Sequence, residues 1–267
     1  MRISLPLGLA LAATLATGAL AAEAGPGHAL PPKDVSFSFE GPFGTYDRGA
    51  LQRGFQVYKE VCSACHSLNR VAFHALADEG GPGFTEAQAK AIAAGYKVPA
   101  GPNDKGETTD ANGTPLTRPG ILADHFPAPF PNDEAARTAN NGALPPDLSI
   151  IEKARNGGAH YVYSILTGFG EKPPAGFKVI DGKYYNPYFE GWNISMPPPL
   201  QDNSVTFSDG TKASVAQEAH DVATFLAWAA EPKMEERKRV GFGVLVFLIA
   251  LAGVFFAAYR KVWKDAH

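Results

Sequence analysis

The two cysteines of this chain lie three positions apart and are followed at once by a histidine, in the sequence Cys62-Ser-Ala-Cys65-His66. This grouping could serve as a redox dithiol, as half of a metal site or as the covalent attachment point of a haem. A redox pair usually opens a helix within a βαβ unit, but this pair ends a predicted helix with no strand before it. A zinc site needs four ligands, and the sequence has no further cysteine. We therefore predict one haem c, attached through Cys62 and Cys65 with His66 as the proximal iron ligand.

The distal iron ligand has fewer candidates. Beyond the initiator, the methionines are Met196 and Met234, and Met234 lies in a charged run beside an apolar segment. Met196 precedes three prolines, which restrict φ, disfavour helix and stiffen the loop. We predict Met196 as the distal ligand, with an ordinary buried methionine as the alternative. The remaining histidines have weaker claims: His28, His74, His125, His160, His220 and His267.

The chain begins with an apolar stretch typical of a targeting segment. Residues 3–20 are apolar or small, and Ala19-Leu20-Ala21 forms a small-residue cleavage pattern before an acidic, Pro/Gly-rich stretch. This pattern predicts a signal peptide over 1–21, with an uncleaved N-terminal anchor as the alternative. The mature protein is therefore expected to leave the cytoplasm.

A second apolar stretch covers residues 240–259, which carry no charge. A helix of that length spans about 30 Å, the thickness of one hydrocarbon core, so a transmembrane helix is favoured over a buried core helix. Both flanks are basic, namely the membrane-proximal segment 233–239 and the tail 260–267. Orientation therefore follows from the signal peptide. It predicts a single-pass membrane protein, with its head outside the cytoplasm and its short tail inside.

Charge is divided unevenly between the head and the anchor. Residues 22–232 have 16 Lys and Arg against 24 Asp and Glu, whereas residues 233–267 have seven against three. An acidic head on a basic anchor suits a basic protein partner and argues against nucleic acid.

The head, residues 22–232, is expected to be mainly α-helical. Spacing of apolar residues and capping side chains predict helices over 47–63, 85–95, 147–156, 160–167 and 214–230. Residues 99–131 are rich in Pro, Gly, Asn and Asp and should be irregular, and a short hairpin is expected over 176–188 around Asp181-Gly182. Helices joined by such long loops would make a poor apolar core, so we expect the haem to fill the middle of the domain.

Five stretches resemble the cytochrome c1 family: "RGFQVYKEVCSACHSL", "DHFPAPFPNDEAARTANNGALPPDLSIIEKAR", "YVYSILTGFG", "YYNPYFEGWNISMPPPL" and "DVATFLAWAAEPKMEERKRVGFGVL". They occur in family order from about residue 42 to the C-terminus. The resemblance implies an enlarged class I cytochrome c head with long Pro/Gly-rich loops on one C-terminal transmembrane helix. It also implies an electron-transfer subunit of a quinol–cytochrome c reductase, in a dimeric membrane complex with cytochrome b. Such a subunit takes electrons from a Rieske iron–sulfur protein and passes them to a soluble or tethered cytochrome c.

The resemblance also implies a set of haem contacts. One of the two carbonyls of Pro145 and Pro146 would accept a hydrogen bond from His66, and Met196 would be the distal ligand. Arg155 and Tyr161 match a pair that contacts a haem propionate. The remaining contacts implied by the family motifs are Asn140, Ile165, Phe189 and Ile194.

Two features depart from some family members. This chain lacks the extra cysteine pair that some bacterial relatives have, and the acidic cluster that others use to dock cytochrome c is not evident between residues 91 and 110. Two other functions stay open from the residues: a membrane-tethered carrier or oxidase haem subunit, and a haem sensor or peroxidase with a displaceable ligand.

Overall fold

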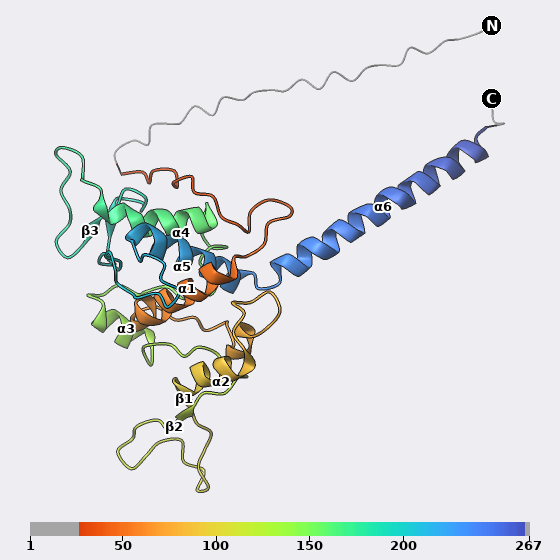
Figure 1. Cartoon of the computed structure of the whole chain (residues 1–267). Coiled ribbons are helices and arrows are strands. Elements are labelled where there is room, and N and C mark those ends of the chain that lie inside the picture. Colours follow the sequence, from red (N-terminus) through yellow and green to blue (C-terminus); the bar gives the residue numbers. More distant parts are fainter. Residues whose placement is uncertain (1–26, 265–267) are drawn as a thin grey trace.

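The computed structural model describes residues 27–264, so the signal peptide predicted over 1–21 lies outside this range. The described chain is mainly helical with very short strands, which confirms the predicted fold class. Its head is built around α1 (Arg48–Glu60), α4 (Gly158–Thr167) and α5 (Val215–Ala230), and one long helix, α6 (Met234–Val262), projects from it (Figure 1). Helix α5 packs against both α1 and α4 and is therefore the central helix of the head.

Shorter elements connect these helices. They are the 3₁₀ turns η1 (Cys62–Ala64), η2 (Phe73–Leu76) and η3 (Gly168–Gly170), the helices α2 (Glu86–Ala94) and α3 (Asp133–Ala139), and the strands β1 (Lys97–Pro99), β2 (Thr117–Pro119), β3 (Tyr184–Tyr185) and β4 (Asn193–Ile194). The strands form two antiparallel pairs, β1 with β2 and β3 with β4. Helix α2 and the β1–β2 pair lie together on one side of the head (Figure 1).

Side chains adjacent in sequence determine where three helices begin. Asp47 accepts a hydrogen bond from the Ala50 backbone N–H, and Ser214 accepts one from Gln217. Thr85 and Gln88 form a reciprocal capping box at α2. Each cap satisfies a backbone donor that the first helical turn leaves unpaired, so these helix starts were predictable from sequence.

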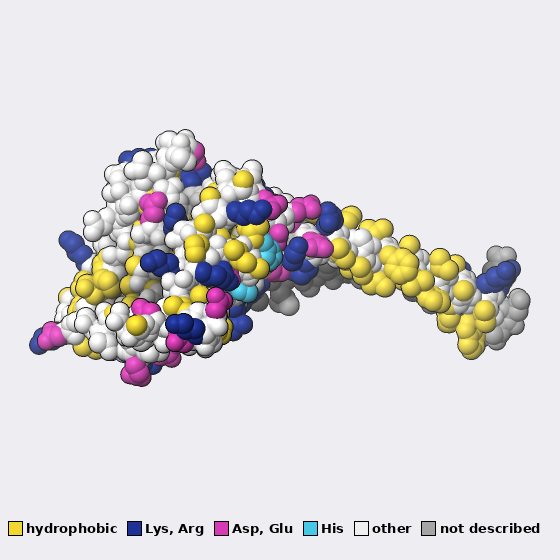
Figure 2. Space-filling model, turned by 90° about the horizontal axis from the view of Figure 1, so that it is seen from below, with side chains coloured by type: hydrophobic (Ala, Val, Ile, Leu, Met, Phe, Trp, Pro, Cys, Tyr) yellow, Lys and Arg dark blue, Asp and Glu magenta, His cyan; other side chains and the backbone are white. Residues whose placement is uncertain are grey.

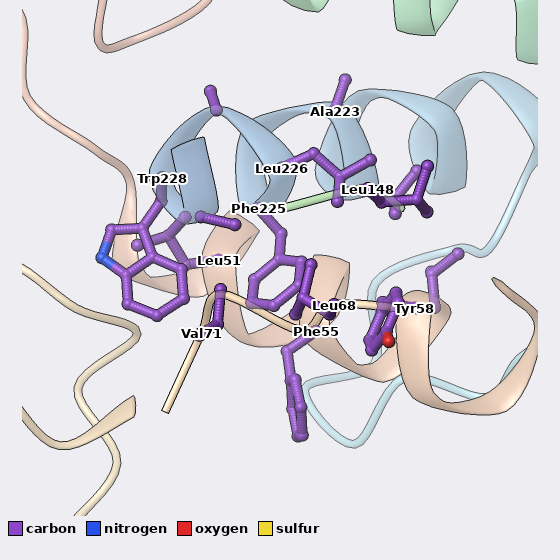
Figure 3. Packing of buried hydrophobic residues seen from close by; sticks show 14 of the residues in the cluster. Leu51, Phe55, Tyr58, Leu68, Val71, Leu148, Ala223, Phe225, Leu226 and Trp228 are labelled. Atoms are coloured by element: carbon purple, nitrogen blue, oxygen red, sulfur yellow. The ribbon is translucent and has the colours of Figure 1, made fainter. Parts of the chain in front are cut away.

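The apolar core is larger than the sequence analysis expected. Side chains of α1 and α5, including Phe55, Tyr58, Phe225 and Trp228, pack against one another with their rings tilted (Figure 3). The two helices approach closely at Gly54, where a Cβ atom would collide with the Asp221 carbonyl. The expectation of a poor apolar core is therefore wrong, because α1 and α5 bury many aromatic side chains between them.

The helix predicted over 147–156 is absent, and residues 150–157 form a series of turns instead. The preceding proline cannot donate a backbone hydrogen bond, and the Asp147 carboxylate accepts from the backbone N–H of Ser149, which stabilises a turn. Gly157, the N-cap of α4, and Gly158, its first residue, then adopt positive φ values of 88° and 50°. Local side-chain bonding and glycine conformations therefore replace the expected helix.

Two further predictions are corrected in part. The stretch 99–131 is mostly irregular, as expected, but its first residue ends β1 and its interior holds β2, which pairs with β1. Asp181-Gly182 does form a turn, yet the strands that pair are β3 and β4, on the C-terminal side of it. Helix α3 had not been predicted, although Asn132 caps it by accepting from the Ala135 backbone N–H.

Helix α6 is continuous from the basic membrane-proximal segment through the predicted transmembrane stretch. Its apolar part is exposed and long enough to cross a membrane, and a band of hydrophobic side chains follows it between charged ends (Figure 2). The first turns of the helix are tied to the head. Glu235 accepts from the Tyr46 backbone N–H at 2.8 Å and pairs with Arg48 at 2.7 Å, while Lys238 donates to the carbonyls of Phe39 and Gly44.

Candidate haem-binding site

The C-x-x-C-H motif follows directly on α1. The helix ends at Glu60, and η1 turns the chain so that the backbone N–H groups of Cys65 and His66 both donate to the Cys62 carbonyl. Both thiols are free; Cys65 is exposed, and Cys62 is partly buried. Burial, with a smaller contribution from Cys65, raises the pKa of Cys62 to about 12. A thiol held in its neutral form is a poor redox nucleophile, which disfavours Cys62 as the attacking thiol of a redox dithiol.

The imidazole of His66 is oriented by one backbone oxygen. Its Nδ1 lies 2.8 Å from the Pro146 carbonyl and donates to it in the neutral tautomer, which leaves Nε2 free to bind iron. Burial lowers the pKa of His66 more than the Pro146 bond and the nearby Asp147 carboxylate raise it. The ring is thus kept in the neutral form that a metal ligand requires.

The segment that carries Pro146 is attached to the segment that carries His66. The Asp147 carboxylate accepts from the Ser67 hydroxyl at 2.7 Å and from the Asn69 backbone N–H at 2.9 Å. The Leu148 backbone N–H donates to the Ser67 carbonyl, and the fully buried Ser149 hydroxyl accepts from the Arg70 backbone N–H. Asn140, Pro145 and Pro146 were predicted here from the sequence, but Asp147 was not. Its only signal was an aspartate directly after two prolines.

Asn140 occupies the C-terminal end of α3, where its side-chain amide donates to the Ala136 carbonyl at 2.7 Å. The next two residues, Asn141 and Gly142, have positive φ values of 52° and 84°, so the chain turns sharply toward Pro145 and Pro146. Pro145 is partly buried and Pro146 is exposed.

The distal candidates form a second, small apolar cluster. Ile165 from α4, Tyr188 and Ile194 from β4 are its buried members. The predicted residues Tyr161, Phe189 and Met196 pack against them as partly buried side chains, with Phe169. The structure therefore brings five predicted residues together: Tyr161, Ile165, Phe189, Ile194 and Met196.

A buried asparagine, which the sequence analysis missed, holds this distal loop against α4. The side-chain amide of Asn186 donates to the Ile165 carbonyl at 2.7 Å, and its carbonyl oxygen accepts from the Tyr188 backbone N–H. Its backbone N–H donates to the Trp192 carbonyl. A fully buried polar side chain that satisfies backbone groups from two segments fixes their relative position.

Arg155 and Tyr161, the two residues predicted to contact a haem propionate, lie in different surroundings. Tyr161 is in the distal cluster, whereas Arg155 is exposed and donates to the neighbouring Ala154 carbonyl at 2.9 Å. The two residues flank the Gly157–Gly158 turn that begins α4. The Arg155 guanidinium is thus accessible to an anionic group near the start of that helix.

The side chains present fit a haem c better than a bare metal ion. Two free thiols, an oriented imidazole with Nε2 available and a thioether in an apolar cluster are the donors that covalent, six-coordinate haem needs. Within residues 27–264 no three His, Cys, Asp or Glu side chains gather as a metal ion would require. The zinc-site alternative is therefore not supported by the described part of the chain.

A mainly helical head with this donor set, on one helix long enough to span a membrane, defines a membrane-anchored cytochrome of the c type. The chain belongs to the Cytochrome C1 family, whose pattern it matches over residues 37–266. It is therefore an electron-transfer protein that carries one covalent haem c, the haem-bearing subunit of the bc1 complex.

The similarity of the chain to individual proteins supports its membership of the Cytochrome C1 family. The chain is 49% identical to cytochrome b/c1 of Bradyrhizobium diazoefficiens over 99% of its own length, and spans 40% of that longer protein. It is 46% identical to cytochrome c1 of Rhodospirillum rubrum, over 86% of both chains. A mitochondrial cytochrome c1 haem protein of Neurospora crassa is 51% identical over 82% of this chain and 64% of its own.

Proposed function

We propose that this chain passes electrons from a Rieske iron–sulfur protein to a soluble or tethered cytochrome c, through one haem c ligated by His66 and Met196. Bound haem c supplies one-electron chemistry by cycling between ferric and ferrous iron. The observation that carries the proposal is the bond from His66 Nδ1 to Pro146, directly after a C-x-x-C motif, in a chain of the Cytochrome C1 family.

The residues of this chain would hold the haem and set its potential. Cys62 and Cys65 would supply the thioether sulfurs, and the Pro146 carbonyl would orient His66 and strengthen it as a donor. The Met196 thioether, a weak neutral donor, favours ferrous iron and so keeps the potential high enough to accept electrons from a Rieske centre. Arg155 and Tyr161 would face the propionates, and the apolar haem contacts would come from Ile165, Phe189 and Ile194.

The proposed setting is a dimeric membrane complex with cytochrome b and the Rieske protein, embedded in lipid. The haem domain would lie on the periplasmic side of a bacterial inner membrane, with residues 260–267 in the cytoplasm. The exposed apolar surface of α6 supports contact with lipid and cytochrome b. The contacts of Glu235 and Lys238 with the head would keep the haem at a fixed height above the membrane.

The central experiment purifies the full chain from its own membranes through an affinity tag at the C-terminus. We expect cytochrome b and a Rieske protein to copurify, and quinol to reduce the haem in the purified complex. A chain that purifies alone, with haem that quinol does not reduce, would contradict the proposal and favour a tethered carrier. Carbon monoxide binding by the native ferrous protein would favour a haem sensor or peroxidase.

A truncation tests the membrane arrangement. The chain should end after Arg239, because Met234 is buried against the head and Glu235 and Lys238 are bonded to it. We expect a haem-loaded head in the periplasmic fraction, since the apolar stretch 240–259 has been removed. A truncated head that stays in carbonate-washed membranes would contradict a single C-terminal anchor.

A further inference from the structure

The strongest network of side-chain hydrogen bonds near His66 centres on the carboxylate of Asp147, next to the proline whose carbonyl faces the imidazole. We propose that Asp147 is a positioning residue for the proximal ligand: it holds the Pro146 carbonyl on His66 Nδ1 and lowers the reduction potential of the haem. This inference rests on the proposed function, because it requires His66 to be an iron ligand.

Both oxygens of this carboxylate are used. Oδ2 accepts from the Ser67 hydroxyl at 2.7 Å and from the Asn69 backbone N–H at 2.9 Å, and Oδ1 accepts from the Ser149 backbone N–H at 2.9 Å. The first two donors immediately follow His66 along the chain, and the third lies on the segment of Pro146. The carboxylate therefore bridges the two segments whose separation sets the bond from His66 to Pro146.

Two backbone donors extend the bridge on either side. The Leu148 N–H donates to the Ser67 carbonyl at 2.9 Å, and the Arg70 N–H donates to the buried Ser149 hydroxyl at 3.0 Å. These bonds make 146–149 and 66–70 one unit. Pro146 itself has no N–H, so its own position depends on the anchored residue that follows it.

The carboxylate is charged where it lies. Burial alone would raise the pKa of Asp147, but hydrogen bonds from Ser149, Asn69 and Ser67 hold it below its usual value. A negative charge near the imidazole stabilises the more positive ferric state. A firm Nδ1–H bond to a carbonyl also makes the imidazole a stronger donor, which again stabilises ferric iron. Both effects lower the potential, so removal of the carboxylate should raise it.

The test is Asp147→Asn in the full chain within its membrane complex. An asparagine keeps the shape but loses the charge, and its amide nitrogen cannot accept a hydrogen bond. We expect potentiometric titration to show a rise in potential equivalent to about a tenfold change in the electron-exchange equilibrium constant, about 59 mV. The His66 Nδ1 proton should also exchange faster with solvent in NMR spectra of the variant.

Asp110→Asn is the matched control. Asp110 likewise accepts from two backbone N–H groups, those of Asn112 and Thr114, but in an exposed loop. Its replacement should leave the potential and the His66 proton unchanged. If Asp147 only stabilised the fold, its replacement would change the reduction potential in the opposite direction. A loosened site would admit water, and water stabilises charged ferric iron and so lowers the potential. An unchanged or lower potential in Asp147→Asn, or an equal rise in the control, would overturn the inference.

Ser67→Ala keeps the test decisive if Asp147→Asn fails to assemble. It removes one donor to the carboxylate but leaves its charge, so we expect faster exchange of the His66 proton and a smaller rise in potential. A Ser67→Ala protein with native exchange and potential would contradict the positioning role. Failure of the proposed function would instead be visible in the native protein, as paramagnetic NMR spectra without an iron-bound His66.

Discussion

On the proposed proximal side of the haem site His66 is oriented by one hydrogen bond to the Pro146 carbonyl, whereas on the proposed distal side Met196 is held mainly by packing. The proximal segment 146–149 is joined to 66–70 through Asp147, Ser149 and backbone groups. In the described structure, residues 195–200 donate no hydrogen bond outside the β3–β4 pair. Three of these residues are prolines, which have no N–H to donate.

The difference concerns how each side fixes a ligand. Hydrogen bonds are directional, so the proximal side sets the angle of an imidazole ring and the tautomer it adopts. Packing is not directional, but stiff prolines and the buried side chains of Ile165, Tyr188 and Ile194 limit where a flexible thioether can move. We therefore expect proximal substitutions to alter the position of His66 by removing single polar atoms. Distal substitutions should alter the position of Met196 by changing side-chain volume or the stiffness of its loop.

The largest expected effect follows from removal of the covalent attachment on the proximal side. Replacement of Cys62 and Cys65 together by alanine should abolish covalent haem, because each thioether needs its own sulfur. Haem-stained denaturing gels measure this directly. Ser63→Ala is the control within the same motif, since the Ser63 hydroxyl only donates to the Lys59 carbonyl. A haem band of native intensity in the double variant would disprove the attachment.

The next largest effect is expected from the distal ligand. Met196→Lys supplies a nitrogen donor that stabilises ferric iron, so the potential should fall by a few hundred millivolts, about several powers of ten in equilibrium constant. Electron transfer from the Rieske protein should nearly stop while covalent haem remains. Met196→Leu should open the iron to carbon monoxide. Potentiometric titration and ferrous spectra with carbon monoxide measure these changes.

Met234→Leu is the control for both Met196 variants, because Met234 is buried beside the start of α6. Its replacement should leave the potential and the near-infrared band of methionine-ligated ferric haem unchanged. If Met196→Leu kept that band and the native potential, the distal ligand would have to be another residue.

A smaller effect is expected from the buried Asn186 on the distal side. Asn186→Leu leaves the buried Tyr188 N–H without its partner, which costs about 1–3 kcal/mol of the free energy of unfolding, while the Ile165 carbonyl keeps only its bond from the Gly168 N–H. The distal loop should then loosen, and imidazole should displace the methionine ligand at lower concentration. Denaturant unfolding and imidazole titration of the ferric protein measure the two effects.

Asn193→Ala provides the comparison for Asn186. Asn193 also bonds backbone groups, of Gly191 and Ile180, but at the surface, where water can replace it. Its loss should cost clearly less stability. Equal effects of the two substitutions would show that burial of Asn186 is not what holds the loop.

The smallest expected effect is a pH dependence of the free energy of unfolding, caused by an ion pair of His160 in α4. His160 Nε2 lies 2.6 Å from Glu40; burial alone would lower the pKa of His160, but Glu40 and the Lys33 carbonyl raise it. Protonated His160 therefore favours the folded state. This contribution is complete below the unfolded pKa of about 6.5 and is lost as pH rises through the folded pKa.

The corresponding measurement compares native protein and His160→Gln. Their difference in free energy of unfolding should be larger at about pH 6 than at about pH 8, by no more than about 1 kcal/mol, because the pair is partly exposed. His74→Gln, at an exposed histidine of η2 that is paired with Asp78, is the control. A difference that grows with pH would have the wrong sign and would exclude this pair as the cause.

Local sequence determined the features that depend on neighbouring residues. The C-x-x-C-H spacing, the caps at Asp47, Thr85 and Ser214, and the uncharged stretch 240–259 each act within a few residues, so they could be read directly. The same holds for Met196, because the prolines that stiffen its loop follow it at once.

Only the tertiary structure decided which distant groups meet. Asp147 bonds donors 78 and 80 positions away, and Asn186 bonds a carbonyl 21 positions away. Neither residue is distinctive in sequence, because Asp and Asn are common wherever a chain turns. The helix expected over 147–156 is absent partly because of the local bond from the Ser149 N–H to Asp147, and partly because the same carboxylate accepts from Ser67 and Asn69 of another segment. Hydrogen bonds between distant segments depend on the packing of α1, α4 and α5, and no local pattern contains that information.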